Sequence, residues 1–129
     1  MANYVIDASA WVEYFMGSQA GQKVKDIVEN EQNEITTNIL TLAELSGFYA
    51  RRNLDFALAK KIILSLSLIY SIDLDFVEEV GKLYAEMRKT KPKISLADIF
   101  VLLSAKKIKA SLVTGDSDFK DIHHVILIK

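Results

Sequence analysis

The chain has no cysteine and only one proline among its 129 residues. The absence of cysteine excludes disulfide scaffolds, thiolate metal sites and cysteine nucleophiles, and it fits a reducing compartment. No basic segment followed by an apolar one stands at the N-terminus, so we expect no signal peptide. The densest apolar run, residues 62–70, is much shorter than the about 20 residues that span a bilayer. We therefore expect a cytoplasmic protein that does not contact membranes.

The chain also has no strong excess of either charge. Its 16 basic and 17 acidic residues give a net charge of −1. Nucleic-acid-binding proteins usually carry a basic excess, so composition argues mildly against such a partner. That argument weakens if several acids gather in one metal-filled pocket. Half of the residues are hydrophobic, and a chain of this length can bury a core, so we expect residues 1–129 to form one domain.

Short apolar or β-branched runs alternate with segments of helical periodicity. The runs predict strands at 4–6, 34–37, 69–72, 111–114 and 125–128. Helices are expected between them, the longest at about 39–52, 56–67, 76–89 and 95–107. In the third of these the expected buried stripe is Val77, Val80, Tyr84 and Met87. This alternation predicts a three-layer α/β/α domain with a central, mostly parallel sheet of about five strands.

Four carboxylates end or interrupt apolar stretches: Asp7, Glu44, Asp98 and Asp116. A carboxylate is costly to remove from water unless it is paired or binds a metal. Asp7 follows the first strand and Asp116 the fourth, so both should emerge at the carboxyl edge of the sheet, where sites form in such folds. Glu44 and Asp98 lie near helix starts and can lean toward that edge. The pattern therefore predicts one acidic pocket for a divalent cation.

Each of these acids also has a purely structural interpretation. Asp7 can cap the following helix, and the segment 114–119, Thr-Gly-Asp-Ser-Asp-Phe, can be an ordinary turn after a strand. In that segment Asp118 can share an ion with Asp116 or hold a water. Asp98 precedes nearly continuous apolar turns, so we do not expect it to be solvent-exposed, whereas Glu44 could face water.

In this order and spacing, the motifs resemble the PIN-domain family over essentially the whole chain. They are a strand Asp with a Ser two residues on, a helical Glu after Thr41, an Asp within Ser-Leu-Ala-Asp, and Thr-Gly-Asp-Ser-Asp-Phe after a strand. The likeness is greatest to VapC-type toxins of toxin–antitoxin pairs. By motif match, the family acids correspond to Asp7, Glu44, Asp98, Asp116 and the frequent fifth, Asp118. Ser9 and Thr114 correspond to polar neighbours of the site.

The resemblance implies a Mg²⁺- or Mn²⁺-dependent endoribonuclease, with an RNA substrate, a cognate antitoxin and a homodimeric state. The chemistry agrees, because Mg²⁺ takes oxygen ligands and lowers the pKa of a water that attacks phosphorus. All family acids are present, so we do not expect an inactive copy. No histidine base is required, and we expect His123 and His124 to be surface or edge residues rather than ligands.

Two other classes of function are considered. One is a non-catalytic PIN-like module that binds RNA or protein. The other is an acid-pocket phosphotransfer protein, which would have paired acids or Asp-x-Asp at the first strand, where this chain has Asp7-Ala8-Ser9. The basic segments 88–93 and 106–109 are expected to be solvated helix ends, the first also a candidate contact for RNA phosphates. A final set of aromatic residues is assigned to the core or a subunit interface: Trp11, Tyr14, Phe15, Phe48 and Tyr49.

Overall fold

The computed structural model describes residues 2–129, and its centre is a five-stranded parallel sheet. The strands are β1 (Asn3–Ile6), β2 (Glu34–Asn38), β3 (Leu68–Tyr70), β4 (Ser111–Thr114) and β5 (Val125–Leu127). The helices are α1 (Ala8–Met16), α2 (Gln19–Val28), α3 (Ile39–Arg51), α4 (Ala57–Leu66), α5 (Leu74–Met87), α6 (Leu96–Lys107) and the short 3₁₀ helix η1 (Ser117–Phe119). None of the helices in this described range is long and apolar enough to cross a membrane.

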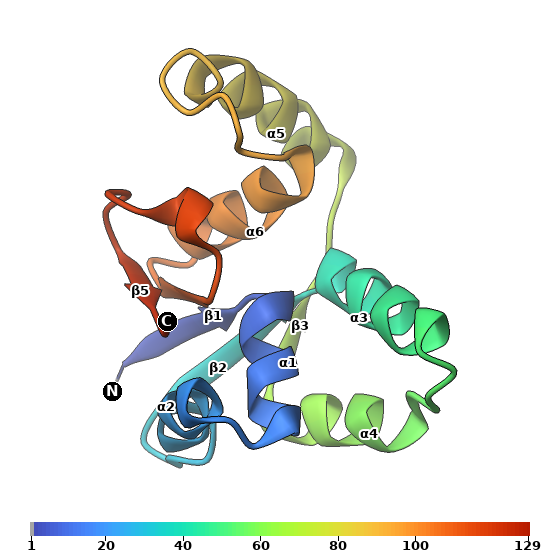
Figure 1. The fold of residues 1–129 in the computed structure, drawn as a ribbon. Coiled ribbons are helices and arrows are strands. Elements are labelled where there is room, and N and C mark those ends of the chain that lie inside the picture. Colours follow the sequence, from blue (N-terminus) through green and yellow to red (C-terminus); the bar gives the residue numbers. More distant parts are fainter. Residues whose placement is uncertain (1) are drawn as a thin grey trace.

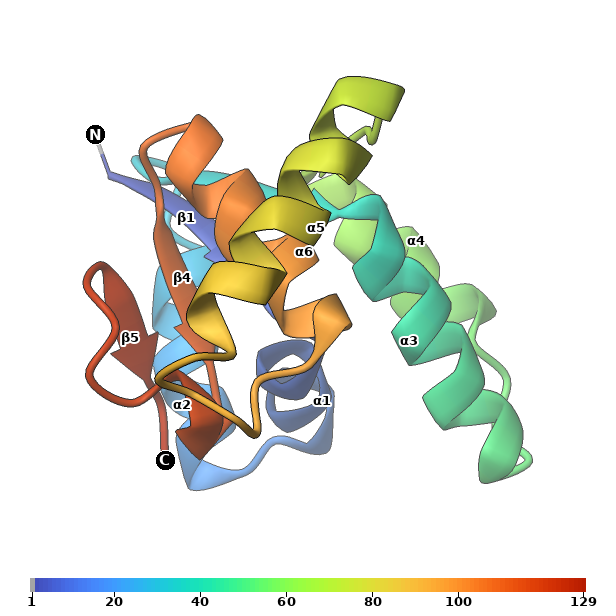
Figure 2. The same ribbon diagram turned by 90° about the horizontal axis from the view of Figure 1, so that it is seen from above.

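Helices cover both faces of the sheet, which confirms the predicted α/β/α layers (Figure 1). Successive strand residues point to opposite faces. Ile6 and Val113 pack with α1, α2 and α4 in one core cluster, whereas Val5 and Leu112 pack with α6 in another. A third cluster joins α5 to α6, and Figure 2 shows α5 lying along the outer side of α6.

The strand order β3-β2-β1-β4-β5 reverses direction between β1 and β4. The chain moves outward from β1 to β2 and β3, then returns to the other side of β1 for β4 and β5. The register pairs Ile6 with Val113, so β1 and β4 end level with each other. In parallel α/β sheets, the crevice beyond the carboxyl ends at such a reversal is the usual place for a site. Here Asp7 and Asp116 follow those two strand ends.

Most helices begin at a polar side chain that accepts a hydrogen bond from the first turn, which defines where each one starts. These caps are Asp7 for α1, Ser18 for α2, Asn38 for α3, Asp73 for α5 and Ser95 for α6.

The cap of α5 explains the main errors in the sequence prediction. Asp73 accepts a hydrogen bond from the Phe76 amide at 2.8 Å, so α5 begins at Leu74 and β3 already ends at Tyr70. The prediction of a strand at 69–72 and a helix from 76 was therefore wrong at this junction. The stripe is also corrected, because Phe76 is buried while Val77 is 45% exposed.

Trp11 belongs to the core, as one of the two expected alternatives. It is fully buried, and its indole Nε1 donates to Thr37 Oγ1 at 3.2 Å. Its ring is stacked with that of Phe15, with the ring centroids 5.9 Å apart. The side chain of Trp11 is therefore covered by the core of its own chain, and no subunit interface is needed to bury it. Tyr14 and Phe15 are only partly buried and pack against the same core cluster.

Candidate metal centre

Asp7 lies at the end of β1 and uses both carboxylate oxygens. Its Oδ1 accepts the Ala8 amide at 2.8 Å, which caps α1. Its Oδ2 accepts the hydroxyl of Thr114 at 2.8 Å and that of Ser9 at 3.3 Å. The structural and the site interpretations are therefore compatible, because one oxygen caps the helix while the other faces polar groups from β4 and α1.

Burial raises the pKa of the Asp7 carboxyl above its usual value, since only 7% of the residue is exposed. Hydrogen bonds from Thr114, Ala8 and Ser9 lower the pKa, and the negative charge of Asp98 raises it further. The net direction is upward. The charged form of Asp7 is thus disfavoured in the protein alone, and a nearby cation would favour it.

Ser9 and Thr114 also hold the loop that follows β4. Their hydroxyl oxygens lie 3.1 Å apart. Ser9 Oγ accepts the Gly115 amide at 2.9 Å, and Thr114 Oγ1 accepts the Asp116 amide at 3.1 Å. These bonds fix the backbone just before Asp116. The two residues matched to polar neighbours of the site therefore connect the Asp7 carboxylate to the backbone amides of Gly115 and Asp116.

Three carboxylates converge beyond the sheet edge. One oxygen each from Asp98, Asp116 and Asp118 lies within 4.8 Å of the other two. Asp98 is the third residue of α6 and forms a capping box with Ser95, in which its Oδ2 accepts the Ser95 amide at 2.9 Å. Asp116 caps η1 by accepting the Asp118 amide at 2.9 Å. Local capping thus positions two of the three acids.

Asp98 is half-buried, which agrees with the expectation that it is not fully solvent-exposed. The capping box places it at the start of α6. Partial burial still raises the pKa of its carboxyl, hydrogen bonds with Ser95 lower it, and the charges of Asp116 and Asp118 raise it again. The net direction is upward, as expected where like charges crowd together.

Glu44 lies on α3 and is exposed as a residue, as its sequence context allowed. Even so, desolvation raises the pKa of its carboxyl to about 7, and the charges of Asp7 and Asp98 contribute in the same direction. Glu44 and Asp7 are outside the set of oxygens that converge within 4.8 Å. The structure therefore brings three of the five proposed acids together and couples the other two to them by charge.

One positioning residue was not identified from the sequence. Asn38 is the last residue of β2 and is fully buried, its Oδ1 accepting the Leu40 amide at 2.8 Å and its Nδ2 donating to the Phe100 carbonyl at 3.2 Å. It therefore links the start of α3, which carries Glu44, to α6, which carries Asp98. The only available signal was a polar residue directly before the expected helix at 39–52.

The basic segment 88–93 lies beside the acids. The Lys91 ammonium donates to the Lys120 carbonyl at 2.6 Å, which places the α5–α6 loop against the residues after η1. Lys91, Lys93 and Asp118 line a shallow hollow of about 300 Å³. His123 and His124 are exposed in the loop before β5, which confirms that they are surface residues. They precede the amino end of that strand, away from the carboxyl edge that carries the acids.

An acid cluster on this fold agrees with the result of a family comparison. The PIN domain model matches residues 4–125. The chain belongs to the PIN domain family. Comparison with the sequences of curated proteins finds no significant match.

Solved structures with the same fold include several toxin–antitoxin proteins. A toxin–antitoxin complex from Klebsiella pneumoniae has 21% identity and a TM-score of 0.72, with 98% of each chain covered. DNA-bound VapBC from Salmonella typhimurium has 16% identity and a TM-score of 0.74, with 100% of each chain covered. Mycobacterium tuberculosis VapC20, described as a toxin that cleaves the sarcin–ricin loop, has 17% identity and a TM-score of 0.73, covering 93% of this chain and 95% of that one. At these identities the likeness establishes the fold.

Proposed function

We propose that this PIN-domain protein is a Mg²⁺- or Mn²⁺-dependent endoribonuclease that acts as the toxin of a VapBC-type pair. The observation that carries the proposal is the convergence of Asp98, Asp116 and Asp118 within 4.8 Å, next to the buried Asp7. Carboxylates that crowd together offer the oxygen ligands that Mg²⁺ and Mn²⁺ prefer. The likeness in fold to VapBC proteins and to an RNA-cleaving VapC toxin supports the same activity.

Each acid has a role that follows from its surroundings. Asp98, Asp116 and Asp118 would hold the cation, and Asp7 would face it with a carboxylate already fixed by Thr114 and Ser9. A bound divalent cation supplies charge stabilisation at the phosphate and lowers the pKa of a water. In the metal-free protein the Glu44 carboxyl has a pKa of about 7, and a bound cation would lower that pKa and favour the carboxylate beside the phosphate.

Basic residues beside the acids suit the backbone of an RNA strand. Lys91 and Lys93 line the hollow next to Asp118, so their ammonium groups can neutralise phosphates that flank the cleaved one. Lys91 is held there by its bond to the Lys120 carbonyl. The near-neutral net charge therefore does not argue against RNA, because several acids are concentrated at one site and lysines lie at its border.

We also propose a cytoplasmic location, a cognate antitoxin and a homodimer. Large exposed apolar side chains favour protein contacts. Of the ten such residues in the described part of the chain, six fall between residues 54 and 77: Leu54, Leu58, Leu64, Leu68, Leu74 and Val77. This segment includes the edge strand β3, which has an open side for pairing. It replaces Trp11 as the structural argument for a partner, because Trp11 is fully buried.

The test is cleavage of single-stranded RNA by the purified protein. We expect internal cuts with Mg²⁺ or Mn²⁺, none in EDTA, and recovery when metal is returned. Asp98→Asn should reduce the rate by orders of magnitude, because it removes a negative ligand while its amide oxygen can still cap α6. Asp121→Asn is the matched control, since Asp121 is exposed and outside the cluster.

Other outcomes point to other functions. Metal-independent cleavage that survives Asp98→Asn would indicate a contaminating ribonuclease and contradict the proposal. Binding of RNA without cleavage under any metal condition would favour a non-catalytic module. Transfer of phosphate onto the protein would favour a phosphotransfer function.

A further inference from the structure

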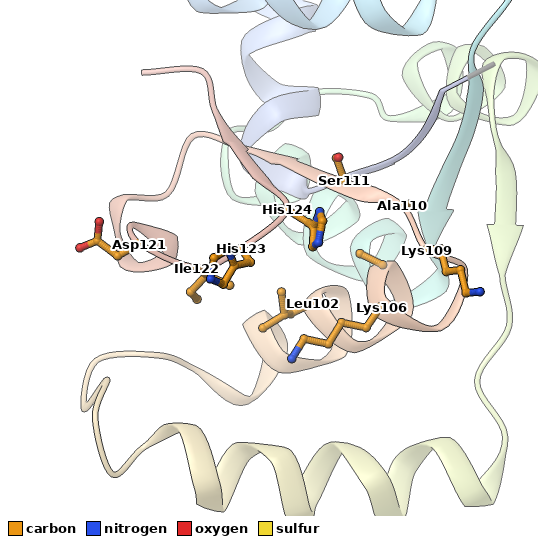
Figure 3. Close-up of a pocket in the computed structure, with 10 residues that line it drawn as sticks. Leu102, Lys106, Lys109, Ala110, Ser111, Asp121, Ile122, His123 and His124 are labelled. Atoms are coloured by element: carbon orange, nitrogen blue, oxygen red, sulfur yellow. The ribbon is translucent and has the colours of Figure 1, made fainter.

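A second cavity lies at the opposite, amino edge of the sheet. It has a volume of about 710 Å³ and is formed by the end of α6, the start of β4 and the loop before β5 (Figure 3). Small-molecule sites commonly have volumes of about 300–1,000 Å³. The acidic residues of the candidate metal centre follow the carboxyl ends of β1 and β4, so the two sites are on different edges of the domain.

The cavity has an apolar floor and a basic rim. Leu102, Ala110 and Ile122 supply the floor, while Lys106, His123 and His124 supply nitrogen atoms around it. Figure 3 shows Lys106 running beneath the two histidines, with Leu102 close to them. The histidine ring centroids are 6.4 Å apart and the rings are tilted by 50°. Histidine rings offer faces on which a nucleobase can stack.

The charge of the rim is mostly positive and not neutralised by the protein. Lys107, the neighbour of Lys106, pairs with Glu79 at 2.8 Å. Within residues 2–129, neither Lys106 nor Lys109 has an acidic partner within ion-pair distance. The one acid at the cavity is Asp121, and Figure 3 shows its carboxylate at the far end, turned away from the histidines. A protein of net charge −1 thus carries a locally basic cavity.

The backbone around the cavity adopts an uncommon conformation. Four non-glycine residues in the described chain have positive φ, and three of them line this cavity: Lys109 (56°), Asp121 (67°) and His124 (61°). A lysine in this region is strained relative to glycine. Such residues cluster at binding sites because the surrounding structure holds them there. Glycine is the usual residue at the position that Lys109 occupies after α6.

We infer that this cavity binds a nucleoside phosphate, with the base on the apolar floor beside the histidine rings and the phosphate at Lys106. The ligand can be a free nucleotide or the terminal nucleotide of an RNA strand, which present the same chemistry. The volume, the apolar floor and the unpaired ammonium group carry the inference together. It does not depend on the nuclease proposal, because no residue of the acid cluster lines the cavity.

The experiment is a methyl and amide NMR titration of the full-length protein in EDTA. The probes are AMP, adenosine, inorganic phosphate and a 5′-phosphorylated RNA tetranucleotide. We expect AMP to shift the methyl signals of Leu102 and Ile122 in a saturable way, and adenosine and phosphate to bind more weakly. Lys106→Met should weaken AMP binding about tenfold or more, because a charge-assisted hydrogen bond is lost. Lys107→Met, at the neighbouring position, should leave binding unchanged.

The two sources of ligand are separated by the same titration. Saturation by AMP assigns the cavity to free nucleotides, whereas saturation by the tetranucleotide alone assigns it to RNA ends. The inference is overturned if neither probe shifts the Leu102 and Ile122 methyl signals. It is also overturned if phosphate binds as tightly as AMP, or if Lys106→Met has no larger effect than Lys107→Met. Asp98→Asn should not change the result, so failure here and failure of the nuclease proposal can be told apart.

Discussion

Replacement of Asp118 by asparagine should raise the stability of the metal-free protein. It should reduce the stabilisation that a bound metal ion provides. The carboxylate of Asp118 lies within 4.8 Å of those of Asp98 and Asp116. Its backbone amide, not its side chain, donates to Asp116, so the substitution removes no side-chain hydrogen bond that the structure records. Asp118→Asn therefore isolates the charge of one acid from any effect on local structure.

The magnitude follows from the distance between the carboxylates. Two unit charges 4.8 Å apart repel by about 0.9 kcal/mol in water. Screening at about 0.15 M salt reduces this to roughly 0.5 kcal/mol for each pair. Asp118 loses two such repulsions, so the metal-free variant should be more stable by about 1 kcal/mol. For a chain of this length that corresponds to a melting temperature higher by about 3–4 °C.

Metal should reverse the order of the two proteins. Mg²⁺ at about 100 times its Kd stabilises a folded protein by about 2.7 kcal/mol, and a tenfold weaker site would gain only about 1.4 kcal/mol. Thermal melts of wild type and Asp118→Asn in EDTA and over a Mg²⁺ titration measure both effects. Asp121→Asn is the control, because Asp121 lies outside the cluster and asparagine tolerates its positive φ of 67°. Equal or lower stability of Asp118→Asn in EDTA, with an unchanged Mg²⁺ shift, would refute the reasoning.

Three further predictions concern pH, a helix end and assembly. The pKa values of Glu44 (about 7, against an ordinary 4.5), Asp7 and Asp98 are raised in the folded protein. The folded state therefore binds protons more tightly than the unfolded state does. The stability of the metal-free protein should consequently fall as pH rises through about 4.5 to 7. Denaturant titrations in EDTA should show this fall, and Glu44→Gln should make it shallower; a flat or rising profile would contradict it. Lys109→Gly should raise the unfolding free energy by about 1 kcal/mol, because glycine accepts the φ of 56° without strain, and a loss of stability would contradict that account. Sedimentation at tens of micromolar should show a dimer that Leu58→Glu weakens and the equally exposed control Met16→Glu does not, whereas a strictly monomeric wild type would argue against the dimer.

The predicted layers and sheet were confirmed because apolar runs and helical periodicity alternate clearly along this chain. The predicted boundary between β3 and α5 was wrong because, in the sequence, Asp73 and Asp75 are both reasonable N-caps for α5. Only the three-dimensional packing shows that Asp73 caps the helix and that Phe76, not Val77, is buried. Helical periodicity in the sequence predicts that a helix such as α5 is present, but it does not identify the residue at which the helix starts.

The candidate site could be predicted in part, for reasons of topology. Asp7 and Asp116 follow neighbouring parallel strands, so a shared edge was foreseeable, and Asp98 lies beside Asp116 as expected. The pKa of Glu44, the role of Asn38 and the cavity at the amino edge could not be foreseen. Each depends on distances between segments far apart in the chain, such as α6 and the loop before β5.

The most direct test of the central claim is to locate Mn²⁺ in a crystal of the wild-type protein by anomalous scattering. The account predicts a strong anomalous peak among the carboxylates of Asp98, Asp116 and Asp118, at the start of α6 and the end of β4. The peak should be lost in Asp116→Asn and retained in Asp121→Asn. Absence of a peak at this edge under saturating Mn²⁺, or a peak only elsewhere, such as at His123 and His124, would contradict it.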